Sequence, residues 1–280
     1  MAWRFTKMHG AGNDFAIIDG RQHLPALDAS DIARAGDRHG GIGFDQLISI
    51  EPARDSRAAF YYGIWNADGS AAQQCGNGAR CVAAWLYRAG ALPLDTPVCL
   101  QSPSGLVSVR LLEPLRVSVN MGAACLTPAS LALDVSAQSE RYTLDVDGEA
   151  VSFAALSMGN PHAVLLVDDI DDPRWTILAP RLATHPAFAH GCNVGIAQIL
   201  NRDTLRLRVF ERGAGWTLAC GSGACAAAVI AQRHADMGTH VKVILPGGTL
   251  SVDCAGDEQP VWLTGPASFV YAGEWLDAPG

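Results

Sequence analysis

The residues best suited to chemistry lie in two Cys-Gly-x-Gly motifs, one in each half of the chain. CGNGARC begins at Cys75 and CGSGAC begins at Cys220, 145 residues further on. Glycine allows a tight turn into a helix, and the first amide groups of a helix have no partner inside it. Such a helix start binds carboxylates and is expected to lower the pKa of a neighbouring thiol below its usual ~8.5. Each motif therefore predicts a carboxylate site beside a reactive sulfur.

Two such units suit a reaction that inverts the α-carbon of an amino acid. A proton must leave one face of that carbon, and another must arrive at the opposite face. Microscopic reversibility requires the two groups to exchange roles in the reverse direction, one entering as thiolate and the other as thiol. Cys75 and Cys220 are the candidate acid/base pair.

Polar residues around the motifs recur with the same spacing, which indicates an internal repeat. Asn66 precedes Cys75 by nine residues, and Glu211 precedes Cys220 by nine. We infer two similar halves whose cysteine motifs face each other across a cleft. An offset of 147 residues also relates Gly12-Asn13 to Gly159-Asn160 and Gln46 to Asn193.

Short Val- and Leu-rich segments bounded by Gly, Pro or Asp predict β-strands, and two Ala-rich segments, 80–89 and 224–235, predict buried helices. The predicted fold is α+β, with two pseudo-symmetric lobes. Each lobe is a central helix wrapped by a bent, mostly antiparallel sheet. We expect residues 1–120 to form the N-terminal lobe, 121–265 the C-terminal lobe, and 266–280 to return to the first. The predicted strands are 98–100, 106–112, 115–120, 163–167, 205–210 and 240–245.

Composition narrows the class of protein. The 280 residues are 49% hydrophobic and 17% charged, and no apolar run approaches the ~18 residues of a membrane span. The net charge of −8 is carried by scattered acidic residues, which argues against a nucleic-acid surface. The N-terminus lacks the apolar core of a signal peptide. We therefore expect a cytoplasmic protein whose partner is a small molecule.

Eight cysteines at irregular spacing predict reduced thiols rather than disulfides. A zinc site of Cys75, Cys81, Cys220 and Cys225 is an alternative, but the C-x5-C and C-x4-C spacings differ from those of C-x2-C knuckles. Packing inside the core is the common role of a cysteine without a partner. That role is predicted for Cys81, Cys225, Cys99, Cys125 and Cys254.

Pyridoxal phosphate also acidifies an α-proton, through a Schiff-base lysine. The chain has two lysines, Lys7 and Lys242, and neither is accompanied by a phosphate-binding sequence. Neither is excluded, but we predict chemistry that needs no cofactor and no metal ion.

Two further motifs place polar groups near these cysteines. In GNPHAV, His162 is a candidate for tuning a thiol and Asn160 for binding a ligand. In FERGAGW, Glu211 offers an anion for an ammonium group, and Arg212 offers a two-pronged clamp for a second carboxylate. The alternative interpretation of these residues is a turn and a surface ion pair.

Eight motifs in order make the chain resemble the diaminopimelate epimerase family over nearly its whole length. The resemblance implies the two-lobed fold of that family and a pyridoxal-independent conversion of LL-2,6-diaminoheptanedioate to its meso isomer, for lysine and peptidoglycan precursor synthesis. It also implies a homodimer. The motifs are MHGAGNDF, GFDQ, NADGS, CGNGARC, SMGNPH, ERGAG, ACGSGAC and LPGG.

Residue roles follow from the same resemblance. Cys75 and Cys220 would be the two acid/base groups, and His162 and Glu211 would modulate their pKa values. The amides at 76–77 and 221–222 would hold the reacting carboxylate, while the Asn residues and Arg212 would bind the distal end. Substrate binding is thereby assigned to Asn13, Gln46, Asn66, Gly76, Asn77, Asn160, Asn193, Glu211, Arg212, Gly221 and Ser222.

The chain departs from the family pattern at two positions: Trp216 stands where Glu is common, and Ala163 follows GNPH where Cys is common. Cys192, next to Asn193, is a further thiol whose state the sequence leaves open. Two other functions remain as alternatives. A proline or hydroxyproline racemase-like enzyme would leave Arg212 without a distal partner. A non-catalytic amino-acid-binding protein would need neither Cys75 nor Cys220.

Overall fold

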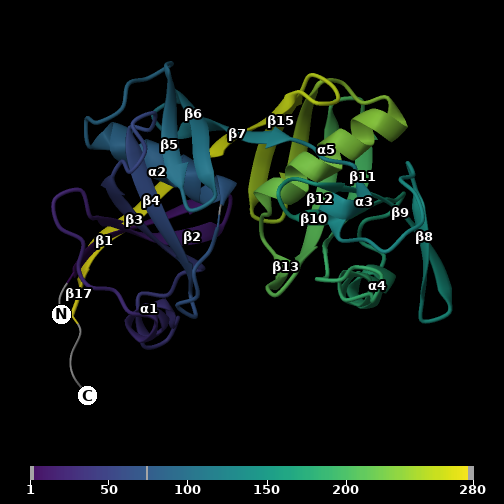
Figure 1. The fold of residues 1–280 in the computed structure, drawn as a ribbon, viewed down its shortest axis with the longest axis horizontal. Coiled ribbons are helices and arrows are strands. Elements are labelled where there is room, and N and C mark those ends of the chain that lie inside the picture. The colour runs from purple at the N-terminus through teal and green to yellow at the C-terminus, as the bar shows by residue number, and fades with distance from the viewer. Residues whose placement is uncertain (1–2, 74, 277–280) are drawn as a thin grey trace. The chain divides into compact units, whose positions relative to one another are not determined.

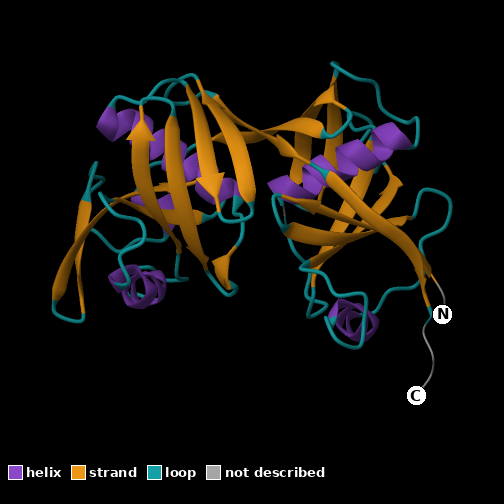
Figure 2. Ribbon diagram, turned by 180° about the vertical axis from the view of Figure 1, so that it is seen from behind, coloured by secondary structure: helices purple, strands orange, loops and turns teal. Residues whose placement is uncertain are grey.

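A computed structural model describes residues 3–73 and 75–276, and the chain divides into two compact units. Unit 1 comprises Met1–Val119 together with Gly265–Gly280, and unit 2 comprises Asn120–Thr264. Each unit consists mainly of β-strands packed around a long helix (Figures 1 and 2). The prediction of an α+β fold with a helix wrapped by a mostly antiparallel sheet is confirmed. Among the described residues, no helix combines the length and apolar character that crossing a membrane requires.

The described residues of unit 1 form eight strands and two helices. The helices are α1 (Ala29–Gly36) and α2 (Gly76–Arg88). The strands are β1 (Trp3–Gly10), β2 (Asn13–Asp19), β3 (Gln46–Pro52), β4 (Phe60–Asn66), β5 (Pro97–Ser102), β6 (Gly105–Glu113), β7 (Arg116–Ala123) and β17 (Ser268–Trp275).

Unit 2 contains nine strands and three helices. The helices are α3 (Pro128–Leu131), α4 (Arg174–Ala183) and α5 (Gly221–Ala235). The strands are β8 (Tyr142–Val146), β9 (Glu149–Ser157), β10 (Pro161–Leu166), β11 (Asn193–Asn201), β12 (Thr204–Glu211), β13 (Gly215–Thr217), β14 (His240–Leu245), β15 (Gly248–Cys254) and β16 (Pro260–Pro266).

The two units repeat one strand order. From β1 to β7, successive pairings are antiparallel, parallel, antiparallel, parallel, antiparallel and antiparallel. The series β9, β10, β11, β12, β14, β15 and β16 shows the same succession. In each unit, the two strands of every parallel pair are joined by a crossover connection, as parallel pairing requires. The repeat read from residue spacing is therefore also a repeat of topology.

The long helices α2 and α5 form the centres of the two units. Nearly all residues from Gly76 to Leu86 are buried, and so are most residues from Gly221 to Ala231. Alanine favours a helix and is small enough for strands to approach it closely. Both helices begin earlier than predicted, because the glycines assigned to a turn form the first helical turn instead.

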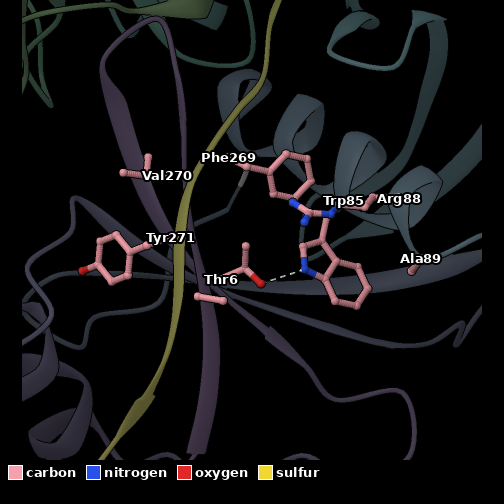
Figure 3. A pocket seen from close by; sticks show the side chains of 8 residues that line it. Thr6, Trp85, Arg88, Ala89, Phe269, Val270 and Tyr271 are labelled. Carbon is pink, nitrogen blue, oxygen red and sulfur yellow. Dashed lines mark hydrogen bonds between the residues drawn. The ribbon is translucent and has the colours of Figure 1, made fainter.

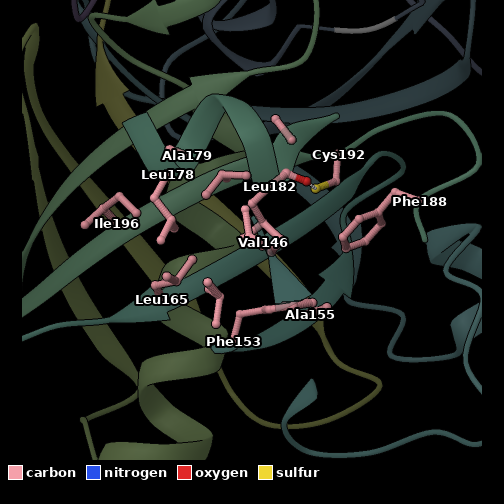
Figure 4. Packing of buried hydrophobic residues seen from close by; sticks show 14 of the residues in the cluster. Val146, Phe153, Ala155, Leu165, Leu178, Ala179, Leu182, Phe188, Cys192 and Ile196 are labelled. Atoms are coloured by element: carbon pink, nitrogen blue, oxygen red, sulfur yellow. Dashed lines mark hydrogen bonds between the residues drawn. The ribbon is translucent and has the colours of Figure 1, made fainter. Parts of the chain in front are cut away.

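Each unit has an apolar core on the outer face of its sheet. In unit 1, Ile32 of α1 lies in one cluster with the strand residues Phe5, Ile18 and Leu47. In unit 2, Leu182 of α4 lies in one cluster with Phe153, Leu165, Cys192 and Ile196 (Figure 4). These clusters hold the strands whose ends carry the candidate site residues.

Candidate active site

Each Cys-Gly-x-Gly motif opens a central helix. Cys75 is the residue before α2, and its sulfur accepts a hydrogen bond from the Gly78 amide at 3.4 Å. Cys220 holds the same position before α5. Gly76-Asn77 and Gly221-Ser222 thus occupy first-turn positions, whose amide groups have no acceptor inside a helix and can bind an anion.

The second glycine of each motif is required by packing. A Cβ added to Gly78 would lie 2.9 Å from Ile48 Cδ1. One added to Gly223 would lie 3.0 Å from Val209 Cγ2 and 3.2 Å from Cys220 Sγ. Only glycine lets the helix start approach the strand beside it this closely.

The paired Gly-Asn dipeptides lie in equivalent turns. Gly12 and Gly159 have φ values of 88° and 90°, in the left-handed region that favours glycine. Asn13 begins β2, and Asn160 immediately precedes β10. Each turn carries its asparagine to the start of the strand beside the cysteine-bearing helix.

In unit 1, the predicted residues Asn13, Cys75 and Asn77 lie together. The Cys75 thiol donates to Asn13 Oδ1 at 3.4 Å, and Asn77 Nδ2 donates to the same oxygen at 3.1 Å. Asn13 Nδ2 donates to the carboxylate of Asp45 at 2.8 Å. Asp45 is a contributor that the sequence did not single out, although it lies within the quoted GFDQ motif.

Gln46 and Asn66 form a second predicted pair in unit 1. They face each other in the register of β3 and β4, and Gln46 Nε2 donates to Asn66 Oδ1 at 3.1 Å. Asn66 Nδ2 donates to Ser70 Oγ at 3.0 Å. Gln46 Oε1 is buried and has no protein partner in the described part of the chain, so an acceptor is left for a bound donor.

In unit 2, a hydrogen-bonded row leads from Cys220 to Asn160. Cys220 Sγ lies 3.6 Å from Ser222 Oγ, which lies 3.0 Å from His162 Nε2. The same ring nitrogen lies 3.1 Å from Asn160 Oδ1. His162 therefore contacts the cysteine through Ser222.

His162 is fully buried, because it occupies the core-facing strand position that Phe15 occupies in unit 1. Burial, assisted by the positive charge of Arg212, lowers the pKa of His162 to about 3. The imidazole is therefore neutral at physiological pH, and its influence on Cys220 is exerted through hydrogen bonding rather than charge.

The expectation of a lowered thiol pKa is wrong for Cys220. Burial raises its pKa well above the ordinary value, and the nearby Glu211 carboxylate raises it further. Hydrogen bonds from Ser222 and the Gly223 amide oppose this rise but are smaller. Desolvation and a neighbouring anion thus outweigh the helix end, and Cys220 is a thiol in this structure.

The other predicted residues of unit 2 lie at the ends of neighbouring strands. Glu211 ends β12 and accepts a hydrogen bond from Thr217 Oγ1 at 2.6 Å. Asn193 is buried and binds two backbone groups, the Pro161 carbonyl at 3.3 Å and the Arg212 amide at 3.0 Å. The amide of Asn193 thereby joins β10, β11 and the end of β12.

Arg212 is exposed, and its Nη1 donates to the His190 carbonyl at 2.9 Å. This contact is not the surface ion pair considered as an alternative role for Arg212, because its acceptor is a backbone oxygen. The guanidinium keeps donors that a carboxylate can engage.

The remaining cysteines differ in how deeply their side chains are buried. Cys81, Cys225 and Cys254 are buried as predicted, and Cys192 is buried in the unit 2 core. Burial raises the pKa values of Cys81 and Cys192 to about 12. None of these eight cysteines, all within the described residues, forms a disulfide bond.

The core prediction is wrong for Cys125 and only partly right for Cys99, which is half-buried. Cys125 is exposed, and its backbone forms an isolated bridge with Ser157, the last residue of β9. Hydrogen bonds from Ser130 and Thr127 lower its pKa.

The two departures from the family pattern have different surroundings. Trp216, on β13, packs edge-on against Phe210 at 5.6 Å between ring centroids and lies beneath the guanidinium of Arg208. Ala163 is fully buried in the unit 2 core, where it leaves room for neighbouring side chains.

Two surface pockets lie away from these residues. One of about 420 Å³ in unit 1 is lined by Thr6, Trp85, Arg88 and residues 269–272 (Figure 3). Another of about 450 Å³ in unit 2 lies between β9, β10 and α4. Neither contains a predicted site residue.

The two lysines and the possible metal ligands bear on the pyridoxal and zinc alternatives. Lys7 is buried and bound to Asp14 at 2.6 Å, and Lys242 is exposed on β14. Within the described ranges, His, Cys, Asp and Glu side chains do not gather in threes that would hold a metal ion.

Comparison with solved structures identifies the fold. A hydroxyproline epimerase from Agrobacterium vitis matches with a TM-score of 0.69, over 99% of this chain and 94% of that chain, at 18% identity. A protein from Pseudomonas aeruginosa described as a predicted epimerase matches with a TM-score of 0.66, over 99% and 100%, at 17% identity. The fold is therefore the one found in these epimerases.

Sequence comparison gives the family. Residues 5–127 and 154–270 match the family described as "Diaminopimelate epimerase". A diaminopimelate epimerase of Ectopseudomonas mendocina is 47% identical over 98% of this chain and 99% of the relative. One of Xylella fastidiosa is 49% identical over 97% and 95%. The chain belongs to the diaminopimelate epimerase family.

Proposed function

We propose that this protein interconverts LL- and meso-2,6-diaminoheptanedioate by proton transfer between two cysteines, in the pathway that supplies lysine and peptidoglycan precursors. The observation that carries the proposal is the repeated half-site: in each unit, a cysteine precedes the first turn of a buried helix. The names of the relatives, at 47% to 49% identity over almost the whole chain, support the substrate.

In the proposed mechanism, the first-turn amides of α2 and α5 bind the carboxylate at the reacting carbon. Their partial positive charge stabilises the negative charge that develops when the α-proton leaves. One sulfur removes the proton as a thiolate, while the other delivers a proton as a thiol. The raised pKa of Cys220 makes it the proton donor at the start of a cycle. Cys75 is then the base that acts on the LL substrate.

The other predicted residues would bind the substrate or adjust the pKa of a catalytic cysteine. Glu211 lies beside Cys220, and its carboxylate both keeps that cysteine protonated and offers an acceptor for the substrate ammonium group. Gln46 presents a buried oxygen that still lacks a partner, which supports a contact with a donor of the substrate. Arg212 would clamp the distal carboxylate, together with Asn66.

The test is conversion of LL-diaminopimelate by purified protein with no added cofactor, before and after treatment with a chelator. We expect the meso isomer to form equally in both samples. Loss of activity on chelation, or a pyridoxal absorbance band that follows activity, would contradict the cofactor-free proposal. Proline serves as the competing substrate, and a kcat/KM for proline comparable to that for diaminopimelate would favour the racemase alternative.

The cytoplasmic location and the homodimer belong to the same proposal. Eight cysteines without a disulfide bond among them suit a reducing compartment. We propose the homodimer from the resemblance of the sequence to the family. Sedimentation of the purified protein tests it: a mass near twice 29.5 kDa is expected, and the mass of a single chain would contradict it.

A further inference from the structure

Arg80 is the largest fully buried side chain in the described part of the chain. It lies in α2, five residues after Cys75, inside the strands of unit 1. A Cβ added to Gly10 of β1 would lie 3.1 Å from Arg80 Nη2, so the glycine leaves room for the guanidinium. Placing a cation here costs free energy, which a well-packed apolar side chain would avoid.

The guanidinium holds the start of its own helix. Arg80 Nη2 donates to Asn77 Oδ1 at 2.8 Å, and Nε donates to the Pro266 carbonyl at 3.3 Å. The first bond decides how the Asn77 amide is oriented, because its oxygen must face the cation. Asn77 Nδ2 then points to Asn13 Oδ1, 3.1 Å away.

An anion orients the second amide. Asn13 Nδ2 donates to Asp45 at 2.8 Å, and Asp45 is itself paired with Arg38 at 2.7 Å. A carboxylate accepts only from the NH2 end of an amide, so the oxygen of Asn13 must face the other way, toward Cys75. Two charges of opposite sign thus fix a row of two amides that ends at the sulfur.

Unit 2 shows that the repeated topology does not need a cation at this position. The residue five after Cys220 is Cys225, which is also fully buried in its helix. In that unit, Ser222 takes the place of Asn77 and contacts the neutral His162. The guanidinium is therefore particular to the half-site of Cys75.

We propose that Arg80 is a positioning residue for Cys75: it acts through Asn77 and Asn13 to align the S–H group of that cysteine, and its buried positive charge favours the thiolate against the preference of the Asn13 oxygen for the thiol. The catalytic role inferred for Arg80 rests on the proposed function. It concerns a residue that does not touch the substrate.

The test compares Arg80→Met, which is neutral and of similar length, with Arg80→Lys, which keeps the charge but loses the planar fork. Arg110→Met, at an exposed ion pair of unit 1, is the matched control. All variants carry Cys125→Ser, because that exposed thiol would consume reagent. The rates of alkylation of Cys75 and Cys220 by iodoacetamide are measured by peptide mass spectrometry across a pH series, together with kcat and KM for LL-diaminopimelate.

We expect Arg80→Met to slow alkylation of Cys75 and move its pH profile upward, with Cys220 unchanged. Tyr62 and Cys81, the titratable neighbours of Cys75, have pKa values raised by burial and stay neutral over the series. Arg80→Lys should show a smaller effect. A fall in kcat of at least about tenfold, larger than any change in KM, is expected for Arg80→Met.

Equal effects on both cysteines, or a lower melting temperature with unchanged alkylation of Cys75, would make Arg80 a packing residue and overturn the proposal. If both Arg80 variants fail to fold, as judged by circular dichroism, Arg80 is likewise a packing residue and the proposal is overturned. Alkylation needs no turnover, so a selective effect on Cys75 in a protein that does not epimerise diaminopimelate would reject the proposed function alone.

Discussion

His162 and Cys220 are joined through a single hydroxyl group. Ser222 Oγ lies 3.0 Å from the imidazole Nε2 and 3.6 Å from the sulfur. Because burial keeps the ring neutral, it orients the hydroxyl without adding a positive charge. Glu211 provides the charge near Cys220, and that charge is negative.

The neutral state of His162 is the first prediction. We expect its ring resonances in NMR spectra to stay constant from about pH 8 to about pH 5, while the protein unfolded in urea shows histidines titrating near ~6.5. A midpoint near the ordinary value in the folded protein would show that His162 is hydrated and chargeable.

The same residue should make stability depend on pH. Its pKa is about 3 in the folded protein and ~6.5 when unfolded, so the unfolded chain binds more protons between these values. The contribution is fully present above pH ~6.5, and the free energy of unfolding should fall as the pH is lowered through this window. His162→Gln should reduce this dependence in urea titrations at several pH values.

Glu211→Gln should make Cys220 more reactive. Removing the carboxylate removes two of the causes that raise the pKa of this thiol, so more thiolate is present at a given pH. Each pKa unit regained gives about a tenfold rise in the rate of alkylation, read from the Cys220 peptide. Glu149→Gln, on β9, is the control, and an unchanged Cys220 rate would remove Glu211 from the control of this sulfur.

Replacing either Cys75 or Cys220 with alanine should abolish net inversion rather than halve it. In the proposed mechanism each sulfur serves one face of the α-carbon, and groups that act as a unit are not additive. In heavy water, the wild-type protein should place deuterium in early meso product while recovered LL substrate stays largely unlabelled. Equal early labelling of both pools, or substantial inversion by either variant, would require a proton route that bypasses one cysteine.

Arg212→Lys tests the distal carboxylate clamp. Lysine keeps the charge but loses the planar fork, and a loss of at least about tenfold in kcat/KM is expected, which corresponds to ~1.4 kcal/mol. Arg202→Lys, in the same unit, should leave kcat/KM unchanged. If Arg212→Lys also leaves it unchanged, the contact of Arg212 with the His190 carbonyl is its whole role.

The sequence by itself determined the family, the repeat and the presence of the two central helices. These features depend on local signals. A Cys-Gly-x-Gly run followed by alanines indicates a helix start whatever surrounds it, and equal spacing of Asn13 and Asn160 reveals the repeat without any structure. The structure confirms that these residues hold equivalent positions at the edges of equivalent strands.

Only the tertiary structure decided the surroundings of each side chain. Cys125 is exposed although Cys81 is buried, and Cys220 is a thiol although it precedes a helix. Arg80 stood in a quoted motif, yet its burial and its bond to Asn77 appeared only when β1 and the Pro266 carbonyl were placed around it. The desolvation of a side chain and its hydrogen-bond partners depend on segments that are far apart in sequence and come together only in the folded protein. Local residue patterns therefore do not predict them.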